Sequence, residues 1–504
     1  MRIAVAGANQ LTADAAAELG AAGGNAVDAC VSAALVAMLT EVGVCALGAG
    51  GFVTVWTADG NPVTIDGYME MPGRGLPPDA FGGGDHRVQM DYGGGLETII
   101  GAGSVATPGG LAALAKAVDL FGSAPWSEVM GPVQDVARNG FPLSGASDFY
   151  FSFAAETVFG VDPRSRAVVI KEDGTRLRKG ETVFVPDLAP TLEAIAAEGA
   201  ALVYRGEVGA MISDHLLANG GILTRQDLEA YEARLREPIH TLFDGWEVAT
   251  NPGPAIGGAA MTAMLRLAGP RCFDLTDAEH ADRAIAAQRA VMRFRRSNLD
   301  GSDHPDVDRL LALSAAGSWD ALMGSPSTIH VSAVDAAGTA CSITMSAGYG
   351  SGVIAPGTGI WLNNSLGEIE LNAAGYHAQT PGTRLVSNMA PTVARDAAGD
   401  VLAIGTPGAD RITTALQLTL LGYLHGGHAL EEAVAAPRLH VELGEGDQYS
   451  VAHEPGVAVS DGHVARPFDD LSMYFGGVAA AVRRADGSLA AAADPRRDGG
   501  VVVL

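Results

Sequence analysis

The pattern of apolar residues changes at residue 328, and this change constrains the fold more than any other feature of the sequence. Residues 328–346 read as a strand with alternating side chains, a turn and a returning strand. Most of the stretch before it, residues 110–320, has a helical pattern instead. Helices, then hairpins, then more helix, without alternating βαβ units, indicate an α+β fold with antiparallel sheets stacked between helical layers.

The other expected elements follow from the same patterns and from local caps. Asn25 is suited to cap a helix after the Gly23-Gly24 break. The expected helices are 10–22, 25–40, 110–121, 188–198, 207–219, 278–294 and 411–424, and further expected strands are 52–57, 62–68, 359–363 and 401–405. Residues 314–326 are expected on the surface.

Length and charge bound the possible architectures and partners. The chain has 504 residues, 48% of them hydrophobic, which suffices for one large core or for two or three domains. Its formal net charge is −26, from 58 acidic and 32 basic residues. Such a surface repels phosphate backbones and anionic lipids, so we expect no nucleic acid and no membrane as partner.

The four cysteines do not form a metal-binding or disulfide pattern. Cys30, Cys45, Cys272 and Cys341 lie far apart in apolar surroundings, so buried free thiols are expected. No metal and no cofactor is expected. The N-terminus lacks the charged and apolar regions of a signal peptide, and no apolar run reaches about 18 residues, so a cytoplasmic location is expected.

The segment around Thr328 carries a possible nucleophile. A small residue, Ser327, precedes the threonine at the start of a strand. A hydroxyl in this place can attack the preceding carbonyl, and hydrolysis of the resulting ester frees an α-amine on the same residue. That amine, with an ordinary pKa of about 8, can act as general base for its own hydroxyl. A threonine at a strand start is also commonly a plain cross-strand residue, so this short motif alone leaves both interpretations open.

The sequence around this segment resembles the γ-glutamyltransferase family from about residue 5 to about residue 499. Similar fragments occur in the family's order, at residues 22–29 (AGGNAVDA), 48–52 (GAGGF), 105–109 (VATPG), 328–330 (TIH), 359–364 (GIWLNN), 387–392 (SNMAPT), 405–409 (GTPGA) and 493–496 (ADPR). The family has Thr-Thr-His where this chain has Thr328, Ile329 and His330. Order and spacing together carry the resemblance.

The resemblance implies the four-layer αββα fold of N-terminal nucleophile hydrolases, made from a self-cleaved precursor. Residues 1–327 would form the heavy subunit and residues 328–504 the light subunit, with cleavage between Ser327 and Thr328. By the same resemblance, Thr328 is the nucleophile and Ser346 the hydroxyl that hydrogen-bonds it. The backbone N–H groups of Gly408 and Ala409 would form the oxyanion hole, provided that the backbone of Ala409 tolerates a Cβ.

The residues that read the γ-glutamyl group in the family are altered. Residues 66–72 (DGYMEMP), which include Tyr68, lack the family's Arg before the glutamate. Losing that guanidinium removes a charge-assisted pair worth about 1.5–3 kcal/mol. Arg74 or Arg384 is a candidate to restore it.

The expected amino-group side of the pocket is altered as well. The candidate binding residues there are Asn364, Glu368, Ser387 and Asn388, of which Glu368 matches the second of two family aspartates. Gly348 stands where the family has an asparagine, and residues 365–387 form a shorter segment, which suggests a missing lid. His330 shares the face of Thr328, and we expect it to be structural because the N-terminal amine supplies the base.

The leading hypothesis is therefore a self-processed amide or acyl hydrolase or transferase acting on a small molecule. γ-Glutamyl transfer stays possible if Glu368, Ser387 and an arginine rebuild the clamp. The same machinery would serve an oxamate-type amidohydrolase, a cephalosporin acylase, or a C–C hydrolase that removes an oxalyl unit in 4-alkyl-proline antibiotic biosynthesis. A non-catalytic binding homologue is the alternative from another class. The sequence does not decide the acceptor or whether the paired subunits assemble into a higher homo-oligomer.

Overall fold

The computed structural model describes residues 1–91, 95–270, 274–299, 302, 305–316, 328–372, 374–446 and 448–504. Two residues of the sequence analysis, Cys272 and Ser327, lie outside this part of the chain. The other three cysteines are buried free thiols.

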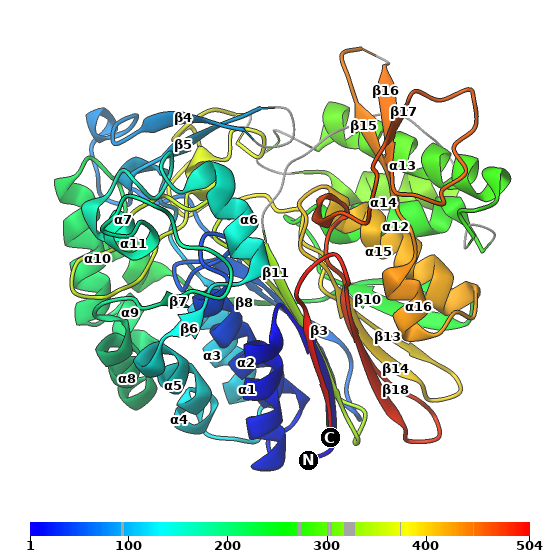
Figure 1. The fold of residues 1–504 in the computed structure, drawn as a ribbon, viewed down its shortest axis with the longest axis horizontal. Coiled ribbons are helices and arrows are strands. Elements are labelled where there is room, and N and C mark those ends of the chain that lie inside the picture. The colour runs from blue at the N-terminus through cyan, green and yellow to red at the C-terminus, as the bar shows by residue number, and fades with distance from the viewer. Residues whose placement is uncertain are drawn as a thin grey trace.

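The first central sheet contains the hairpin expected after residue 328. Its strands, within the described residues, are in spatial order β20 (Gly500–Val503), β1 (Ile3–Gly7), β11 (Ile329–Asp335), β12 (Ala340–Ser346), β2 (Gly50–Trp56), β3 (Val63–Gly67) and β8 (Arg234–Arg236). All neighbours pair antiparallel. The two ends of the chain are therefore neighbours, as β1 pairs with β20 (Figure 1).

The second central sheet packs face to face against the first. Its described strands are β19 (Leu489–Ala493), β18 (Ala479–Arg483), β14 (Val401–Gly405), β13 (Thr392–Asp396), β10 (Trp246–Thr250) and β9 (Ile239–Phe243). The contact lies mainly between β11 and β12 on one side and β14 and β18 on the other. Small buried residues, including Ala4, Ala403 and Ala481, fill this interface.

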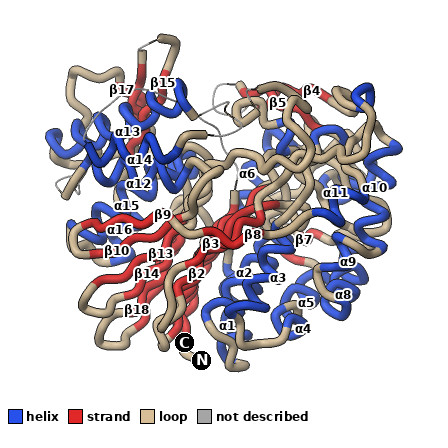
Figure 2. The backbone as a smooth tube through the Cα atoms, turned by 180° about the vertical axis from the view of Figure 1, so that it is seen from behind, coloured by secondary structure: helices blue, strands red, loops and turns tan. Residues whose placement is uncertain are grey.

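Helices cover the outer face of each sheet, giving the order helix, sheet, sheet, helix (Figure 2). The first sheet is covered by α1 (Gln10–Ala21), α2 (Ala26–Thr40) and α3 (Gly110–Phe121), and the second by α12 (Gly257–Ala268), α15 (Arg411–Leu420) and α16 (Leu430–Ala435). All of α2 is buried, which explains its almost wholly apolar sequence. The predicted α+β, four-layer αββα fold is confirmed.

The remaining elements extend the two helical flanks. Helices are α4 (Trp126–Val129), α5 (Gly131–Asn139), α6 (Gly145–Ala154), α7 (Pro163–Val169), α8 (Leu188–Glu198), α9 (Ala201–Tyr204), α10 (Glu207–Ala218), α11 (Arg225–Ala230), α13 (Ala278–Asn298), α14 (Val307–Ala316) and a π-helix, η4 (Leu421–His425). Two small sheets pair β4 (His86–Met90) with β5 (Leu96–Ile100) and β6 (Phe141–Pro142) with β7 (Thr182–Val183). A three-stranded sheet has the order β15 (Leu439–Leu443), β16 (Tyr449–His453) and β17 (Ala465–Pro467).

The expected elements agree with the structure where local signals are strong. Asn25 caps α2 by accepting the N–H groups of Val27 and Asp28, as its position suggested. The expected strand at 359–363 is wrong: this stretch makes only isolated bridges, Gly48 with Leu362 and Ile354 with Trp361. The hairpin β9–β10 lies inside a region interpreted as helical. Residues 314–316 belong to α14, and the rest of the expected surface segment falls outside the described residues.

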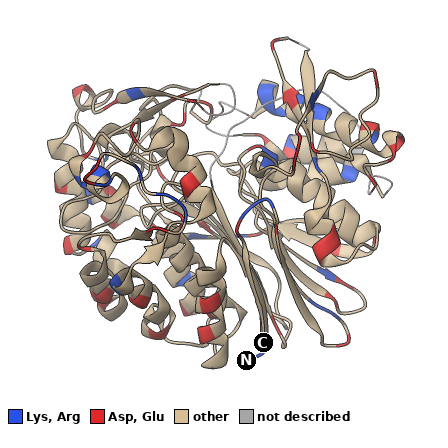
Figure 3. Cartoon of the chain, viewed as in Figure 1, with Lys and Arg blue, Asp and Glu red and all other residues tan. Residues whose placement is uncertain are grey.

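Charged residues gather on the outer helices and loops, as Figure 3 shows. Among the described residues, no helix combines the length and apolar character needed to span a bilayer.

A buried charge cluster fastens the C-terminal segment to the three-stranded sheet. The Arg496 guanidinium donates to both carboxylate oxygens of Glu454 and, at 3.0 Å, to Asp494. Arg438 pairs with Asp494 at 2.7 Å, so two guanidinium groups meet two carboxylates inside the protein. Buried pairs of this kind are costly to break because removing one partner leaves an uncompensated charge.

We therefore predict that Arg496→Met lowers the unfolding free energy by about 3–5 kcal/mol. The matched control is Arg138→Met, whose side chain is 49% exposed and pairs with Asp135 and Glu193 on the surface. Urea denaturation of both variants measures the difference. Equal midpoints for the two variants would show that the buried cluster does not stabilise the fold.

Candidate active site

Thr328 and Ser346 face each other at the end of the central hairpin. Ile329 pairs with Met345 in the β11–β12 register, so the next pair outward is Thr328 opposite Ser346. Thr328 is only 3% exposed and precedes β11. The Ser346 hydroxyl accepts the N–H of Gly348 at 3.0 Å. The structure thus brings the predicted nucleophile and its predicted hydroxyl partner together through strand register.

Gly408 and Ala409 form a tight turn between β14 and α15. Gly408 has φ 129°, and a Cβ there would lie 2.9 Å from the Cα of Gly476, so this position requires glycine. Ala409 has φ 60°, which a residue with a Cβ rarely adopts and which is typical of strained functional turns. Neither N–H has an acceptor among the described residues. Both lie at the positive N-terminal end of α15, which suits binding of a developing oxyanion.

The charged residues after this turn are paired. The Arg411 Nη1 lies 2.5 Å from Asp410 Oδ1, and its guanidinium lies over the Tyr474 ring at 4.6 Å. Burial would raise the pKa of Asp410, but Arg411 and His440 outweigh it and hold that pKa at about 2. Asp410 is therefore ionised at neutral pH and offsets part of the charge of Arg411.

A pocket opens in front of Thr328. Thr328 and Gly408 both line it, which places the predicted nucleophile and the turn at one cavity. The other described residues of its lining are mostly apolar or aromatic: Val44, Met90, Ala146, Phe149, Tyr150, Phe153, Tyr349, Met473 and Tyr474, with Arg411 and Arg497. The site thus offers a hydrophobic pocket with two guanidinium groups in its wall.

The six predicted substrate-binding residues are not in this lining. Tyr68, Asn364, Glu368, Arg384, Ser387 and Asn388 are all buried, and none of them lines the pocket. Asn364 binds protein groups: it accepts the N–H of Tyr349 and donates to Thr98 and Ile99. Asn388 accepts from the buried Arg295 at 2.6 Å.

Three of these residues form a closed group of their own. The Tyr68 hydroxyl lies near Ser387, Ser365 and Glu368. Burial, and then repulsion from Glu370, raise the pKa of Glu368 well above its usual range. Burial therefore disfavours the charged carboxylate that would attract an ammonium group.

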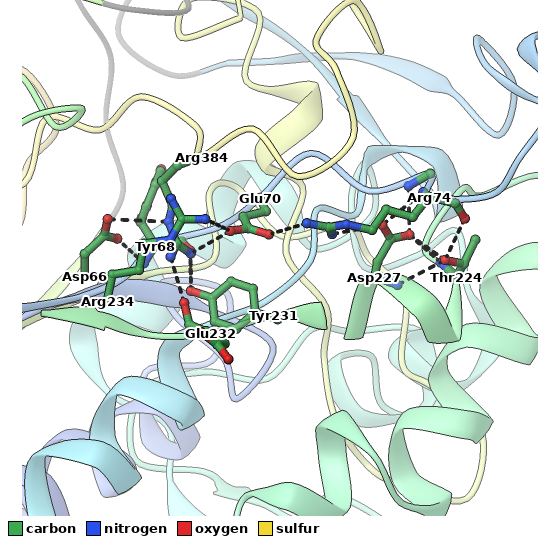
Figure 4. A network of polar contacts seen from close by, with 11 residues as sticks. Asp66, Tyr68, Glu70, Arg74, Thr224, Asp227, Tyr231, Glu232, Arg234 and Arg384 are labelled. Carbon is green, nitrogen blue, oxygen red and sulfur yellow. Dashed lines mark hydrogen bonds and ion pairs between the residues drawn. The ribbon is translucent and has the colours of Figure 1, made fainter. Parts of the chain in front are cut away.

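The two candidate arginines are engaged with the protein. Arg384 donates to the backbone carbonyls of Tyr68 and Glu232, at 2.6 and 2.9 Å (Figure 4). Arg74 lies between Glu70 and Asp227, at 3.2 and 3.3 Å. Neither guanidinium lines the pocket of Thr328, so this arrangement does not favour the expected contact with a substrate carboxylate.

His330 lies between the two sheets, away from the pocket of Thr328. Its Nδ1 lies 2.8 Å from the Thr344 hydroxyl and its Nε2 2.8 Å from the Ser332 hydroxyl. Its ring fills the space over Gly405, so that a Cβ added to Gly405 would lie 2.2 Å from the ring of His330. Burial lowers the pKa of His330 to about 3, so the ring is neutral at ordinary pH. These contacts fit the structural role expected for it.

The aromatic wall of the pocket was not among the residues singled out from the sequence. Phe149, Tyr150 and Phe153 all come from α6. Their signal is the run of aromatics at residues 149–153 in a chain with only 6% aromatic residues. Arg411 and Arg497 carry no such local signal. Among the described residues, no group of three or more His, Cys, Asp or Glu side chains is placed to hold a metal ion.

The comparison with known proteins assigns the chain to a family. A family model described as gamma-glutamyltranspeptidase matches residues 12–504. The chain belongs to the gamma-glutamyltranspeptidase family. The family predicted from the ordered fragments is thereby confirmed, and the chain is an enzyme of the N-terminal nucleophile hydrolase class.

Relatives within this family carry two kinds of name. The chain is 32% identical to an acylase ACY 1 proenzyme from Pseudomonas sp. (strain V22), over 98% of this chain and 92% of that protein. It is 30% identical to a glutathione hydrolase proenzyme from Pseudomonas aeruginosa, over 99% of this chain and 94% of that protein. The crystal structure of a cephalosporin acylase from Bacillus halodurans superposes with a TM-score of 0.82 at 24% identity, covering 99% and 95% of the two chains, which shows the shared fold.

The buried neutral His330 predicts an acid-dependent loss of stability. Its folded pKa of about 3 lies below the ordinary value of 6.5, so between these values the unfolded chain binds more protons. Stability should therefore fall as the pH decreases from 6.5 towards 3. We predict a steeper fall of unfolding free energy between about pH 7 and about pH 4 for the wild type than for His330→Asn. Parallel curves in urea denaturation would contradict this assignment.

Proposed function

We propose that this member of the gamma-glutamyltranspeptidase family is a self-processed acylase that prefers a bulky apolar or aromatic acyl group over γ-glutamyl. The supporting observation is the lining of the Thr328 pocket, which is aromatic and apolar, while the six residues expected to read a glutamyl group lie buried outside it. Apolar walls with a few polar groups are typical of sites for hydrophobic ligands.

Self-processing would begin with the Thr328 hydroxyl. Its Oγ attacks the carbonyl carbon of residue 327, the C–N bond breaks, and the nitrogen of Thr328 takes a proton. The resulting ester is hydrolysed by water, which leaves a carboxylate on Ser327 and a free amine on Thr328. The nearby Ser346, opposite Thr328 in the register, is placed to hydrogen-bond the attacking hydroxyl.

Turnover would use the same atoms on an external amide. The free amine of Thr328 accepts the proton of its hydroxyl, and Oγ attacks the substrate carbonyl. The N–H groups of Gly408 and Ala409 bind the oxyanion, an interaction worth about 3–4 kcal/mol per donor in comparable sites. The amine product leaves with the proton, and water then resolves the acyl-enzyme.

The positive charge in the pocket suits a substrate that also carries an anionic group. Arg497 lies near Glu41, and burial raises the pKa of Glu41 despite hydrogen bonds from Asn9 and Ser144. Arg411 and Arg497 both line the pocket, so two guanidinium groups contribute to its wall. An aromatic acyl amide with a carboxylate fits both features of the lining.

The self-cleavage is tested by the mass and the N-terminal sequences of the purified protein. We predict two fragments from the wild type, one beginning at Thr328. Thr328→Ala should remain a single chain without activity, because it has no nucleophile. Thr328→Ser retains a hydroxyl and should cleave, more slowly. A wild-type chain that stays intact and hydrolyses amides would refute the processing step.

The acyl preference is tested with two p-nitroanilides that share one leaving group. We predict that the cleaved enzyme has a higher kcat/KM for phenylacetyl-p-nitroanilide than for γ-glutamyl-p-nitroanilide. Phe149→Ala, which shortens the aromatic wall, should lower kcat/KM for the phenylacetyl compound about tenfold.

The control for this variant is Phe184→Ala. Phe184 is also an exposed phenylalanine, at 59% against 44% for Phe149, but it does not line the pocket. Its removal should leave kcat/KM unchanged. A wild-type enzyme that prefers the γ-glutamyl compound would overturn the proposed acylase function.

A further inference from the structure

A buried network of charged groups surrounds the backbone of Tyr68 (Figure 4). The carboxylates of Asp66, Glu70 and Asp227 are almost completely buried. They face arginines from separate parts of the chain: Arg74 and Arg234 next to Glu70, Arg236 next to Asp66, and Arg384 between Asp66 and Glu70. Apart from Arg384, all these residues lie before residue 328.

Arg384 is the arginine of the network that contacts Tyr68 directly. Its Nη1 donates to the carbonyl of Tyr68 at 2.6 Å, and its Nε lies 3.4 Å from the Asp66 carboxylate. The hydroxyl of Tyr231 donates to the same carbonyl at 2.6 Å, and the Arg384 guanidinium lies 4.8 Å from the centre of the Tyr231 ring. Two donors therefore hold one carbonyl oxygen.

The other side of Tyr68 is fixed equally well. Its N–H donates to Asp66 Oδ1 at 3.0 Å, and its ring stacks on Phe52 with 5.6 Å between ring centres. A backbone hydrogen bond also joins the neighbouring segments: the N–H of Leu385 donates to the carbonyl of Met69 at 2.9 Å. Contacts of the Tyr68 backbone and of its ring thus fix the direction of the side chain.

The hydroxyl of Tyr68 lies near Ser387, Ser365 and Glu368. Burial raises the pKa of Glu368 well above the ordinary value. A Cβ on Gly348 would lie 3.0 Å from Glu368, and the Gly348 N–H donates to Ser346, which faces Thr328. Few contacts therefore separate Thr328 from the Tyr68 hydroxyl.

We propose that Tyr68 determines acyl specificity and that Arg384 positions Tyr68. The Tyr68 side chain closes the end of the site at Glu368 and Ser387 against acyl groups that carry a charged α-amino acid head group. This inference rests on the proposed acylase function. A charged head group entering there would have to displace the phenol and its stacked ring, and would lose water beside a carboxyl group whose charged form burial disfavours. An apolar acyl group seated in the aromatic pocket meets no such barrier.

The test uses the full, self-cleaved enzyme and the same two p-nitroanilides. The measured quantity is the ratio of kcat/KM for the γ-glutamyl compound to that for the phenylacetyl compound. Tyr68→Ala should raise this ratio about tenfold or more, because it opens the closed end. Tyr68→Phe keeps the ring and should change the ratio by less than about threefold. Tyr68→Leu, which keeps apolar bulk against Phe52, replaces the alanine variant if that one does not fold, and it should also raise the ratio.

Arg384 is tested by its conservative and non-conservative variants. Arg384→Met should raise the ratio in the same direction as Tyr68→Ala, and adding it to Tyr68→Ala should have little further effect. Arg384→Lys should restore part of the wild-type ratio, because an ammonium can still donate to the Tyr68 carbonyl. The matched control is Arg236→Met, which removes an ion-pair partner of Asp66 that, unlike Arg384, does not donate to the Tyr68 carbonyl. It should leave the ratio unchanged.

The outcomes separate this inference from the proposed function. A ratio that stays within about twofold in a self-cleaving Tyr68→Ala or Tyr68→Leu enzyme overturns the role of Tyr68. Equal losses for both substrates in Arg384→Met, with no change in ratio, would show that Arg384 is merely structural. A wild-type enzyme that prefers the γ-glutamyl compound instead refutes the acylase proposal itself, whatever the variants do.

Discussion

Close packing of the two central sheets is the constraint on which the rest of the structure depends. The sheets meet through alanines and glycines, so that β11 and β12 of one sheet lie directly against β14 and β18 of the other. The ring of His330 fits over Gly405 at the end of β14. Because β14 leads within three residues to Gly408, the same packing brings the turn with Gly408 and Ala409 to the pocket in which Thr328 lies. A bulkier interface would separate Thr328 from the N–H groups of Gly408 and Ala409.

Buried charges shape the site without lining its pocket. Asp66, Glu70 and Asp227 would be costly in the interior if they were alone, and each is compensated by arginine or by backbone N–H groups. This compensation uses Arg74 and Arg384, the two guanidinium groups that sequence comparison offered for a substrate carboxylate. The acyl pocket instead receives its character from α6, whose aromatic side chains cover the space next to Thr328.

The elements that could be predicted from the sequence are those with local signals. The hairpin after residue 328 alternates in polarity, and the α2 cap at Asn25 follows a glycine break, so both were found. The stretch 359–363 is apolar and short like a strand, but its backbone bonds to isolated partners rather than to a continuous edge. Strands β9 and β10 do carry a local signal that the sequence analysis overlooked: they form a hairpin across Asp244-Gly245, two residues with positive φ, and β10 also pairs with the distant β13.

By itself the sequence determined the family and the layered fold class, and it predicted the chemistry centred on Thr328, because ordered motifs and periodicity are local properties of the chain. It also showed that the glutamyl-reading residues differ from those of the family. Only the tertiary structure decided how those positions are surrounded. Whether Arg384 faces a substrate or the carbonyl of Tyr68, and in which direction the pKa of Glu368 shifts, depends on burial and on partners distant in sequence. These are properties of the packed chain, since desolvation and ion pairing arise only when separate segments meet.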